Sequence, residues 1–523
     1  MRRLALVVAA ASLAAACTAG PADPPTHDSP RSLCGLPQES RTWILNGHDP
    51  ERSGEVQVVP REGYPVGPGI SHAPPSRGTQ HVPLFWYGPG QVPAVGPVED
   101  PVTVADVAPT IAEMLGFAFD APDGRELPDV VEDRDAEPPA LVAVLIWDGV
   151  GRNVLEEHPD DWPLLRSLMA DGVWYEDAVV GSSPSNTPAV HATVGTGAFP
   201  RRHGRMTLEF RIDGELVQAE VVGPADLRLP SLADEWDAAR GNRPQVGLVG
   251  TRGWHLGLLG RGAAHPGGDR DLAALLDPET GAWGLTDPDD RAFAFPEVVA
   301  GTPGLEEELR RLDLADGEAD GAWMGEEVLD DPLLHPLTPA FSAHQTEAVR
   351  RLVRSEGFGA DGETDLLFLN YKQVDLAAHR WTMHAEQVRA ALRASDEALG
   401  ELTELFDEAA GPGRWALALT SDHGLVEAAE VSGRPPIDPD ELARDLREAF
   451  GEETIEEVHS TQVFVDVAAL EAAGDTLDDV ASFVAGYTRG QNVADPDALT
   501  AEERRHRLFE AAFPGGLLER DPC

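Results

Sequence analysis

The sequence predicts an α/β fold, a three-layer sandwich in which a mostly parallel central sheet is flanked by helices and carries a cap insertion. Short apolar runs alternate along the chain with helical stretches, which is the pattern of a doubly wound sheet. Several runs end in Asp, Asn or His, and such sheets bind ligands at the carboxyl ends of their strands. A chain of 523 residues is long enough for one large core with insertions.

The expected elements begin with two early strands, at 54–59 and 82–87. Residues 104–116 predict a helix, because apolar residues recur at helical spacing before a glycine. Residues 141–151 predict a buried strand with Asp148 at its end. Further strands are expected at 174–180, 245–250, 365–371 and 415–424, and helices near 161–170 and 384–409.

Composition divides the chain into segments. Residues 117–139 are rich in Pro and acidic side chains and are the best candidate for a linker. The expected segments are a lipoprotein signal peptide (1–17), a flexible tether (18–33), a first piece of the catalytic core (34–120), a linker (121–140), a core segment with the candidate nucleophile (141–204), a cap region with some core strands (205–360) and the remaining core (361–523).

The charge balance excludes one class of partner. Lys and Arg total 40 against 91 for Asp and Glu, which gives a formal charge of −51. Such a surface repels nucleic-acid polymers and anionic membranes, so no nucleic-acid polymer is an expected partner and a membrane is expected only through a lipid anchor at Cys17. Any site for an anionic substrate must therefore supply its own local positive charge.

The first 17 residues, "MRRLALVVAAASLAAAC", have the charged start and short apolar run of a processing signal. The run is too short for a membrane span, and Ala-Ala-Ala-Cys resembles a bacterial lipobox. We expect an extracytoplasmic protein, lipid-anchored at Cys17 or else secreted. In that oxidising compartment Cys34 and Cys523 are expected to form a disulfide, which would make the two chain ends neighbours.

Metal-binding side chains gather where the predicted strands end. Each taken alone has an ordinary explanation as a turn or surface residue, but together they suit two divalent ions with mixed oxygen and nitrogen ligands, such as zinc, with manganese as an alternative. The candidates are Asp148, the pair Asp375 and His379, the adjacent Asp422 and His423, and the histidines at 72 and 81.

The candidate nucleophile is Thr187, which Pro188 follows at the start of a predicted helix. Thr at the N-cap with Pro after it is also ordinary helix-start chemistry. A helix N-terminus attracts anions, however, and a hydroxyl beside a metal ion is activated toward phosphorus. The metal ligands elsewhere in the chain therefore favour the catalytic interpretation.

These motifs together resemble the alkaline phosphatase superfamily, and within it the nucleotide pyrophosphatase/phosphodiesterase branch and related bacterial phosphatases with a Thr nucleophile. The resemblance covers roughly residues 141–470. Its pieces, in order, are Asp148, Thr187 in "TPxxHxTxxTG", Asp375-x-x-x-His379 and Asp422-His423-Gly424.

The family's last histidine normally lies near the C-terminus, but here its sequence context stands near the N-terminus. "SHAPPSRGTQHVPLFWYGPG" (71–90) and "DVAPTIAEMLG" (106–116) resemble that C-terminal piece. We therefore expect a circular permutation in which 34–120 is the displaced piece and a Cys34–Cys523 bridge clamps the cut. Exchange of segments between two chains is the alternative geometry.

The resemblance implies two zinc ions, one held by Asp375, His379 and His72, the other by Asp148, Asp422 and His423 with Thr187 close by. His72 is preferred over His81 as the last ligand. The implied activity is hydrolysis of phosphodiester or pyrophosphate bonds in small, nucleotide-like phosphate esters through a phospho-threonine. The alternatives are a phosphomonoesterase of the same superfamily and a metal- or anion-binding surface lipoprotein without turnover.

Four further residues are candidates for substrate contacts. Asn186 precedes the nucleophile, and an Asn that diesterases place after the "HG" of the nucleophile helix is missing here. Arg252 and Lys372 are positive side chains of the kind that monoesterases use on phosphate oxygens. His255 is a candidate for stacking on a leaving group.

Overall fold

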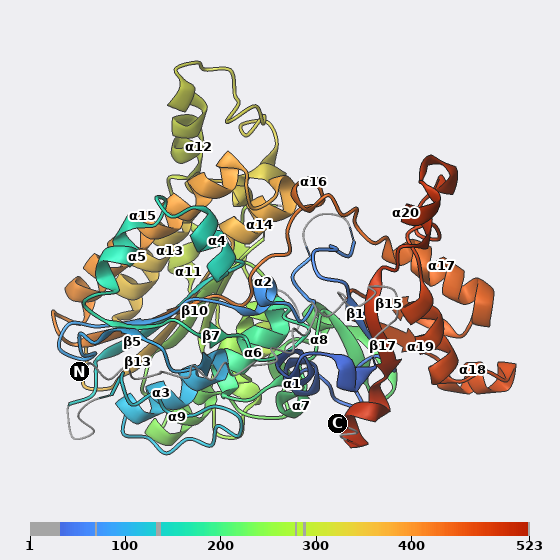
Figure 1. Ribbon diagram of the computed structural model, residues 1–523. Coiled ribbons are helices and arrows are strands. Elements are labelled where there is room, and N and C mark those ends of the chain that lie inside the picture. Colours follow the sequence, from blue (N-terminus) through green and yellow to red (C-terminus); the bar gives the residue numbers. More distant parts are fainter. Residues whose placement is uncertain (1–31, 68–70, 132–136, 278–279, 286–288, 521–522) are drawn as a thin grey trace, which may run out of the picture.

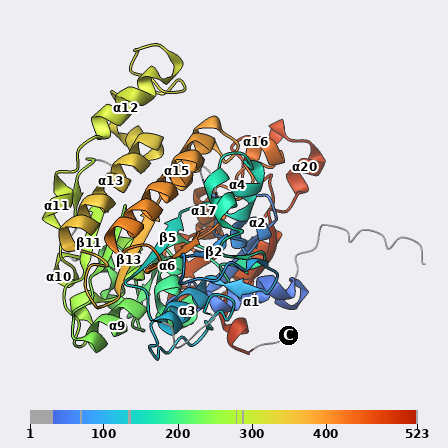
Figure 2. The same cartoon turned by 90° about the vertical axis from the view of Figure 1, so that its left-hand side faces the viewer.

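The computed structural model describes residues 32–67, 71–131, 137–277, 280–285, 289–520 and 523. Its centre is a nine-stranded sheet with helices on both faces, so the predicted three-layer α/β sandwich is confirmed (Figures 1 and 2). The strands, in spatial order, are β12 (Trp283–Gly284), β11 (Leu272–Leu276), β10 (Val246–Gly250), β13 (Asp365–Tyr371), β5 (Leu141–Trp147), β14 (Trp415–Thr420), β2 (Leu84–Tyr87), β6 (Val173–Tyr175) and β3 (Gly96–Val98).

The middle of the sheet is formed by β13, β5 and β14, whose side chains are all buried. The three strands are parallel, and Tyr371 of β13 pairs with Trp147 at the end of β5 while Thr420 of β14 pairs with Ile146. Burial on both faces explains why these segments are continuous apolar runs. Because the strands end level with one another, the residues that follow them lie together.

Each face of the sheet is covered by its own layer and its own core. One layer contains α13 (Pro339–Glu356), α15 (Glu386–Ala409), α14 (Gln373–Trp381) and α5 (Pro163–Leu168), packed on Leu145, Leu369 and Leu419. The opposite layer contains α3 (Val107–Met114), α6 (Thr187–Thr196) and α9 (Leu232–Arg240), packed on Val144, Ile146 and Phe368.

The N-terminal strand β2 completes the sheet between β14 and β6 and is antiparallel to both. Its Leu84 pairs with Thr420 across the ladder, so a segment from the start of the chain is inserted beside one from its last quarter. The strand expected at 174–180 is two short strands, β6 and β7 (Ala178–Val179), because the chain turns at 176–177.

A second, antiparallel sheet lies beside the main body and was not expected from the sequence. It has the order β15 (Ile455–Val458), β16 (Gln462–Val465), β1 (Val56–Pro60) and β17 (Phe509–Pro514). It packs against α17 (Pro439–Phe450) and α19 (Leu477–Gly486) around its own core. Figure 1 shows this unit in orange and red, with β1 as its contribution from the N-terminal segment.

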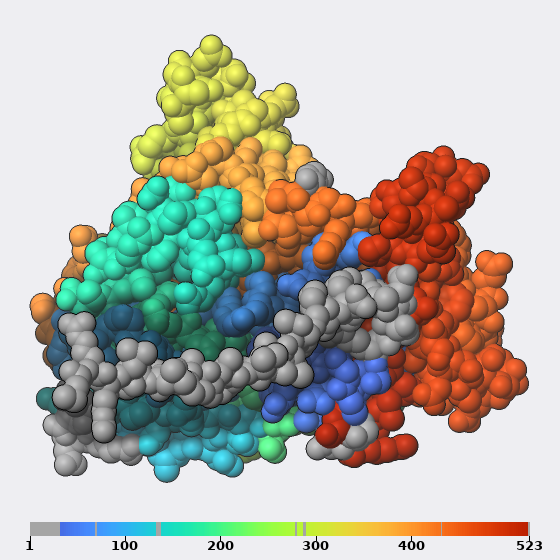
Figure 3. Space-filling model, in the orientation of Figure 1, coloured from blue at the N-terminus to red at the C-terminus, as the bar shows by residue number. Residues whose placement is uncertain are grey.

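The segment 205–360 contributes both to the sheet and to the surface. Its strands β10 and β11 extend the central sheet, and β8 (Glu209–Ile212) and β9 (Glu215–Gln218) form a separate hairpin. The part around α12 (Leu305–Asp313) projects from the body at the top of Figures 1 and 3. Part of the expected linker is packed rather than extended, since Leu127 and Val130 are buried.

The two ends of the described chain are joined by a disulfide between Cys34 and Cys523, whose Cα atoms lie 5.2 Å apart. Leu33, Leu36 and Leu518 belong to a small apolar cluster at this junction. The predicted signal peptide, Cys17 and nearly all of the predicted tether lie outside the described residues. In the part of the chain that the structure describes, none of the helices is both long enough and apolar enough to cross a membrane.

We predict that the disulfide contributes measurably to stability, because it closes a loop with a sequence separation of 489 residues and so restricts the unfolded chain. The free energy of unfolding of the double variant Cys34→Ser/Cys523→Ser, measured by denaturant titration, should be about 3 kcal/mol lower than that of the natural chain. Reductant should destabilise the natural chain similarly and leave the double variant unchanged. Insensitivity of the natural chain to reductant would contradict the prediction.

Candidate metal centre

Three carboxylates meet at the carboxyl ends of β5, β13 and β14. Asp148 follows β5 directly, Asp375 lies in the first turn of α14 after β13, and Asp422 lies two residues beyond β14. All three side chains are buried. The Asp148 amide donates to the carbonyl of Tyr371 over 2.9 Å, which fixes the loop after β5 to the end of β13.

Glycine at position 149 permits this close approach. Its φ is +72°, and a Cβ built there would stand 2.8 Å from the Cβ of Asp375. A side chain would therefore push the α14 loop away and separate the two carboxylates. The Gly149 amide also donates to Asp422 Oδ1 over 3.1 Å, so one short turn positions two of the three acids.

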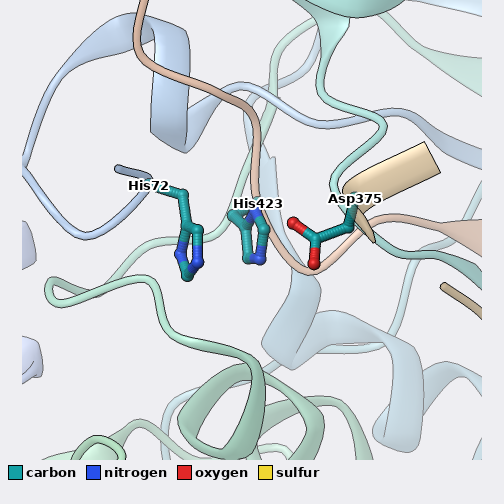
Figure 4. Close-up of side chains that lie close together, drawn as sticks. All are labelled: His72, Asp375 and His423. Atoms are coloured by element: carbon teal, nitrogen blue, oxygen red, sulfur yellow. The ribbon is translucent and has the colours of Figure 1, made fainter. Parts of the chain in front are cut away.

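His72 reaches this site from the N-terminal segment. Its ring is stacked on that of His423 with 3.7 Å between centroids, and it meets the ring of His379 edge-on at 5.5 Å. Ligand atoms of His72, His423 and Asp375 lie within 4.8 Å of one another (Figure 4). His72 Nδ1 lies 3.2 Å from the carbonyl of Ser185, to which it must donate, so Nε2 keeps a free lone pair.

His81 lies elsewhere. It follows the short helix α2 (Arg77–Gln80), and its backbone forms a bridge with Val179. It belongs to none of the ligand groups among the described residues. The geometry therefore favours His72 over His81 as the ligand from this segment.

A second group consists of Asp148, Asp422 and His423, whose ligand atoms also lie within 4.8 Å. His423 Nε2 lies 3.4 Å from Asp422 Oδ2 and 3.8 Å from Asp148 Oδ1. His423 Nδ1 donates to the carbonyl of Gly424 over 3.2 Å, so Nε2 again carries the lone pair. The motif Asp-His-Gly thus orients its own imidazole.

The polar atoms of the site test whether metal ions fit it. Asp375 Oδ1, Asp422 Oδ2 and His423 Nε2 are buried and have no hydrogen-bond partner. Buried polar atoms are normally bonded, so three such atoms within the two ligand groups fit bound cations. Mixed carboxylate and imidazole donors suit zinc or a similar divalent ion. His379 extends the set, with its Nε2 3.4 Å from Asp375 Oδ1.

Burial and local charge set the protonation of these groups. Burial lowers the pKa of His72 well below its usual value and also lowers the pKa of His423, so both imidazoles are neutral and able to bind metal. Burial and then the charge of Asp148 raise the pKa of Asp422. Burial acts to raise the pKa of Asp375 too, but Lys372 and His379 outweigh it and hold that pKa well below the usual range.

Lys372 lies between the two ligand groups. Its Nζ is 2.8 Å from Asp148 Oδ1 and 2.9 Å from Asp375 Oδ2, and its side chain is 8% exposed. Burial acts to lower the pKa of Lys372, but the charges of Asp148 and Asp375 raise it above the usual value. The ammonium is therefore charged and forms part of the centre.

Thr187 is the first residue of α6, and Asn186 is the N-cap, one position earlier than expected. Both side chains are largely buried. Asn186 Nδ2 donates to Thr207 Oγ1, and these two residues line a cavity of about 180 Å³. His72 and His379 line the same cavity, so it adjoins the candidate ligands.

His191 and Asn370 hold Asp148 in place, and sequence reasoning missed both. Asn370 Nδ2 donates to Asp148 Oδ2 over 2.9 Å and lies 3.0 Å from His191 Nε2. His191 Nδ1 donates to the carbonyl of Thr187 over 2.9 Å, and burial lowers its pKa to about 4. The sequence did contain a signal for both residues, because each is a polar residue within a largely apolar segment, Asn370 in β13 and His191 in α6.

The other two candidates for substrate contact do not line the cavity beside His72 and His379. Arg252 lies 3.6 Å from Glu220 and packs over the ring of Trp254. His255 is fully buried, accepts backbone N–H groups through Nδ1, and points Nε2 toward Asp148 Oδ2 at 3.7 Å.

Comparisons with known proteins agree with this architecture. The alkaline phosphatase PafA of Elizabethkingia meningoseptica is 28% identical over 87 residues, 16% of each chain. The alkaline phosphatase PhoV of Synechococcus elongatus is 34% identical over 82 residues, 15% of this chain and 14% of that protein. The chain thus matches about a sixth of the length of these relatives. A crystal structure of PafA superposes with a TM-score of 0.51 at 16% identity, over 66% of this chain and 76% of that one, which shows a shared fold.

The three-layer α/β sandwich, with acids and histidines at its strand ends, has the fold of the alkaline phosphatase PafA. The model of the type I phosphodiesterase / nucleotide pyrophosphatase family matches residues 142–220 and 285–508, together more than half of the chain. The protein belongs to that family, a branch of the alkaline phosphatase superfamily. The predicted family is confirmed, and with it the predicted enzyme class, phosphoric ester hydrolases, which the description of the family names.

We predict that His72, and not His81, binds metal. His72→Ala should weaken binding of one ion by more than about 100-fold, because substitution of residues merely behind a ligand already costs 10–100-fold. His81→Ala is the matched control and should bind as the natural chain does. Zinc titrations of chelator-treated protein measure both, and equal affinity in the two variants would contradict the assignment.

Proposed function

We propose that this protein is an extracytoplasmic, divalent-metal-dependent hydrolase of small phosphoric esters that uses Thr187 as nucleophile. The observation that carries the proposal is the buried cluster of Asp148, Asp375, Asp422 and His423 with His72, at the edge of the sheet where the family's chemistry is expected. The family match gives this cluster its chemical context.

In this proposal two zinc ions are the cofactors, because imidazole and carboxylate donors are mixed in the site; manganese, which the carboxylates also suit, is the alternative. Asp375, His379 and His72 would hold one ion, and Asp148, Asp422 and His423 the other, with Thr187 beside it. Bound ions would supply Lewis acidity, which lowers the pKa of a hydroxyl or water and offsets negative charge on phosphorus.

The chain's own residues account for the covalent steps. Thr187 Oγ attacks phosphorus, so a P–O bond to threonine forms as the ester P–O bond breaks. The threonine proton passes to solvent and the leaving oxygen takes a proton from solvent. Water then attacks the phospho-threonine, releases the phosphate product and restores the hydroxyl. The N-terminus of α6 favours negative charge here through its free N–H groups and its dipole.

Two substrate classes are supported by different observations. The family description favours phosphodiesters and pyrophosphate bonds. Lys372 favours phosphomonoesters, because it adds positive charge to the centre, and both curated relatives are named alkaline phosphatases. The cavity beside His72 and His379 has no Phe, Tyr or Trp among its described lining residues, so it suits a small polar leaving group better than a stacked base.

We predict that the purified full chain with zinc hydrolyses bis(p-nitrophenyl) phosphate, p-nitrophenyl phosphate or both, and that their kcat/KM ratio assigns the class. Thr187→Ala should lower the rate by at least about 10³-fold, because it removes the nucleophile. Thr187→Ser keeps a hydroxyl and should retain measurable activity. If two ions bind but neither ester is cleaved above Thr187→Ala, a metal- or anion-binding surface lipoprotein becomes the better assignment.

The location is part of the same proposal. The N-terminal 17 residues suit a lipoprotein signal with attachment at Cys17, or secretion without a lipid. The disulfide between Cys34 and Cys523 supports an oxidising compartment.

We also propose that the chain is a circular permutation of its family's order. In support, the family match begins only at residue 142, whereas β2 and His72, which precede it, complete the sheet and the centre. The chain ends, bridged at Cys34 and Cys523, are close enough for a direct connection.

A variant with the present termini joined and new termini opened elsewhere tests the permutation. Residue 523 would be joined to residue 34 through a short linker, and the chain opened between residues 131 and 137. We expect this variant to fold and to bind zinc as the natural chain does. Opening inside β5 instead, between residues 143 and 144, is the control and should abolish folding. Failure of both variants would contradict the permutation.

A further inference from the structure

Lys372 is the only lysine in the 523-residue sequence; all the other basic residues among the 40 Lys and Arg are arginines. The ammonium group of lysine differs from the planar guanidinium in being compact and in donating in three directions. The single lysine lies in the candidate metal centre, in contact with Asp148 and Asp375.

The ammonium group touches both ligand groups at once. It is bonded to Oδ1 of Asp148, from one group, and to Oδ2 of Asp375, from the other. The two contacts hold the carboxylates of Asp148 and Asp375 together, whereas His379 lies beside Asp375 alone.

The two ligand groups are not equally free to accept an ion. In the group with His72, Asp375 keeps Oδ1 without a hydrogen-bond partner, because Lys372 occupies only Oδ2. In the other group, both oxygens of Asp148 are occupied, Oδ1 by Lys372 and Oδ2 by Asn370. Oδ1 is also the oxygen that lies 3.8 Å from the free Nε2 of His423.

We propose that Lys372 is an internal competitor for one of the two metal ions, and that it makes them bind in a fixed order. An ion at His72 and Asp375 finds free ligand atoms and binds first. An ion at Asp148, Asp422 and His423 has to take Asp148 Oδ1 from the ammonium, which moves away as the ion binds. This inference rests on the two-ion centre of the proposed function and adds the order in which it loads.

The single lysine makes a direct measurement possible in the natural chain. Protein grown on [ε-13C]lysine has one labelled position, so its NMR spectrum reports Lys372 alone. After chelator treatment, titration with zinc should shift this signal only slightly through the first equivalent, because Lys372 keeps its contact with Asp148, and strongly through the second, when that contact breaks. Calorimetry should show two phases, the second at least about tenfold weaker. A signal that makes its main shift with the first equivalent, or shifts with neither, overturns the proposal.

A variant gives the second, independent test. Lys372→Met keeps length and removes the charge, so it should tighten the second phase by at least about tenfold and leave the first phase unchanged. Arg350→Met is the matched control, because Arg350 pairs with Glu347 and Glu401 away from the ligands, and it should change neither phase.

The outcomes separate this inference from the function beneath it. Two ions that bind with equal affinity in the natural chain and in Lys372→Met overturn the role of Lys372 and leave the metal centre intact. A natural chain that binds no zinc at all overturns both.

Discussion

Three carboxylates buried close together are the constraint on which the rest of this structure depends. Asp148, Asp375 and Asp422 are each at most 2% exposed, and like charges buried together are costly unless cations compensate them. The sheet imposes their proximity, because β5, β13 and β14 are parallel and end at the same level. Lys372 compensates Asp148 and Asp375. His379 lies beside Asp375, and the buried atoms without hydrogen-bond partners are where bound ions would add the remaining charge.

The N-terminal segment that carries His72 and β2 packs against the same end of the sheet as the three carboxylates. The edge of the sheet beside β14 is closed by β2, and the loop before β2 delivers His72 to the ring of His423. Neither contact could form if the segment were free, and the bridge between Cys34 and Cys523 ties its start to the end of the chain. The completeness of the centre therefore depends on contacts between residues about two thirds of the chain apart, such as His72 and His423.

The sequence predicted most of the central fold and of the ligand set, for an identifiable reason. Strands buried on both faces are continuous apolar runs, so an Asp directly after such a run, as at Asp148, is conspicuous. Asp375 and Asp422 follow runs of the same kind. Sequence alone offered two histidines, His72 and His81, and only the folding of the loop decides which one faces the acids.

What could not be predicted depends on long-range packing. The strand β1 is short and shows little alternation of apolar and polar residues, so its sequence did not indicate a separate antiparallel sheet. Its partners lie some 400 residues away in the chain, as in the pairing of Gln57 with Gln462. Asn370 looked like part of an apolar strand, and its amide bond to Asp148 exists only because β13 and β5 end together. Lys372 was noticed as a positive side chain, but its position between two carboxylates is a property of the folded loop.

The charge of the centre connects these features to the choice of substrate. Three carboxylates opposite two divalent ions leave one net positive charge, which would balance the single charge of a phosphodiester. The ammonium of Lys372 adds one more, and the total would then balance a phosphomonoester dianion. On a surface with a formal charge of −51, this local excess is the main attraction for an anion. The position of Lys372 when both ions are bound, in contact with the carboxylates or turned toward the substrate, therefore decides which of the two anions the site is built to neutralise.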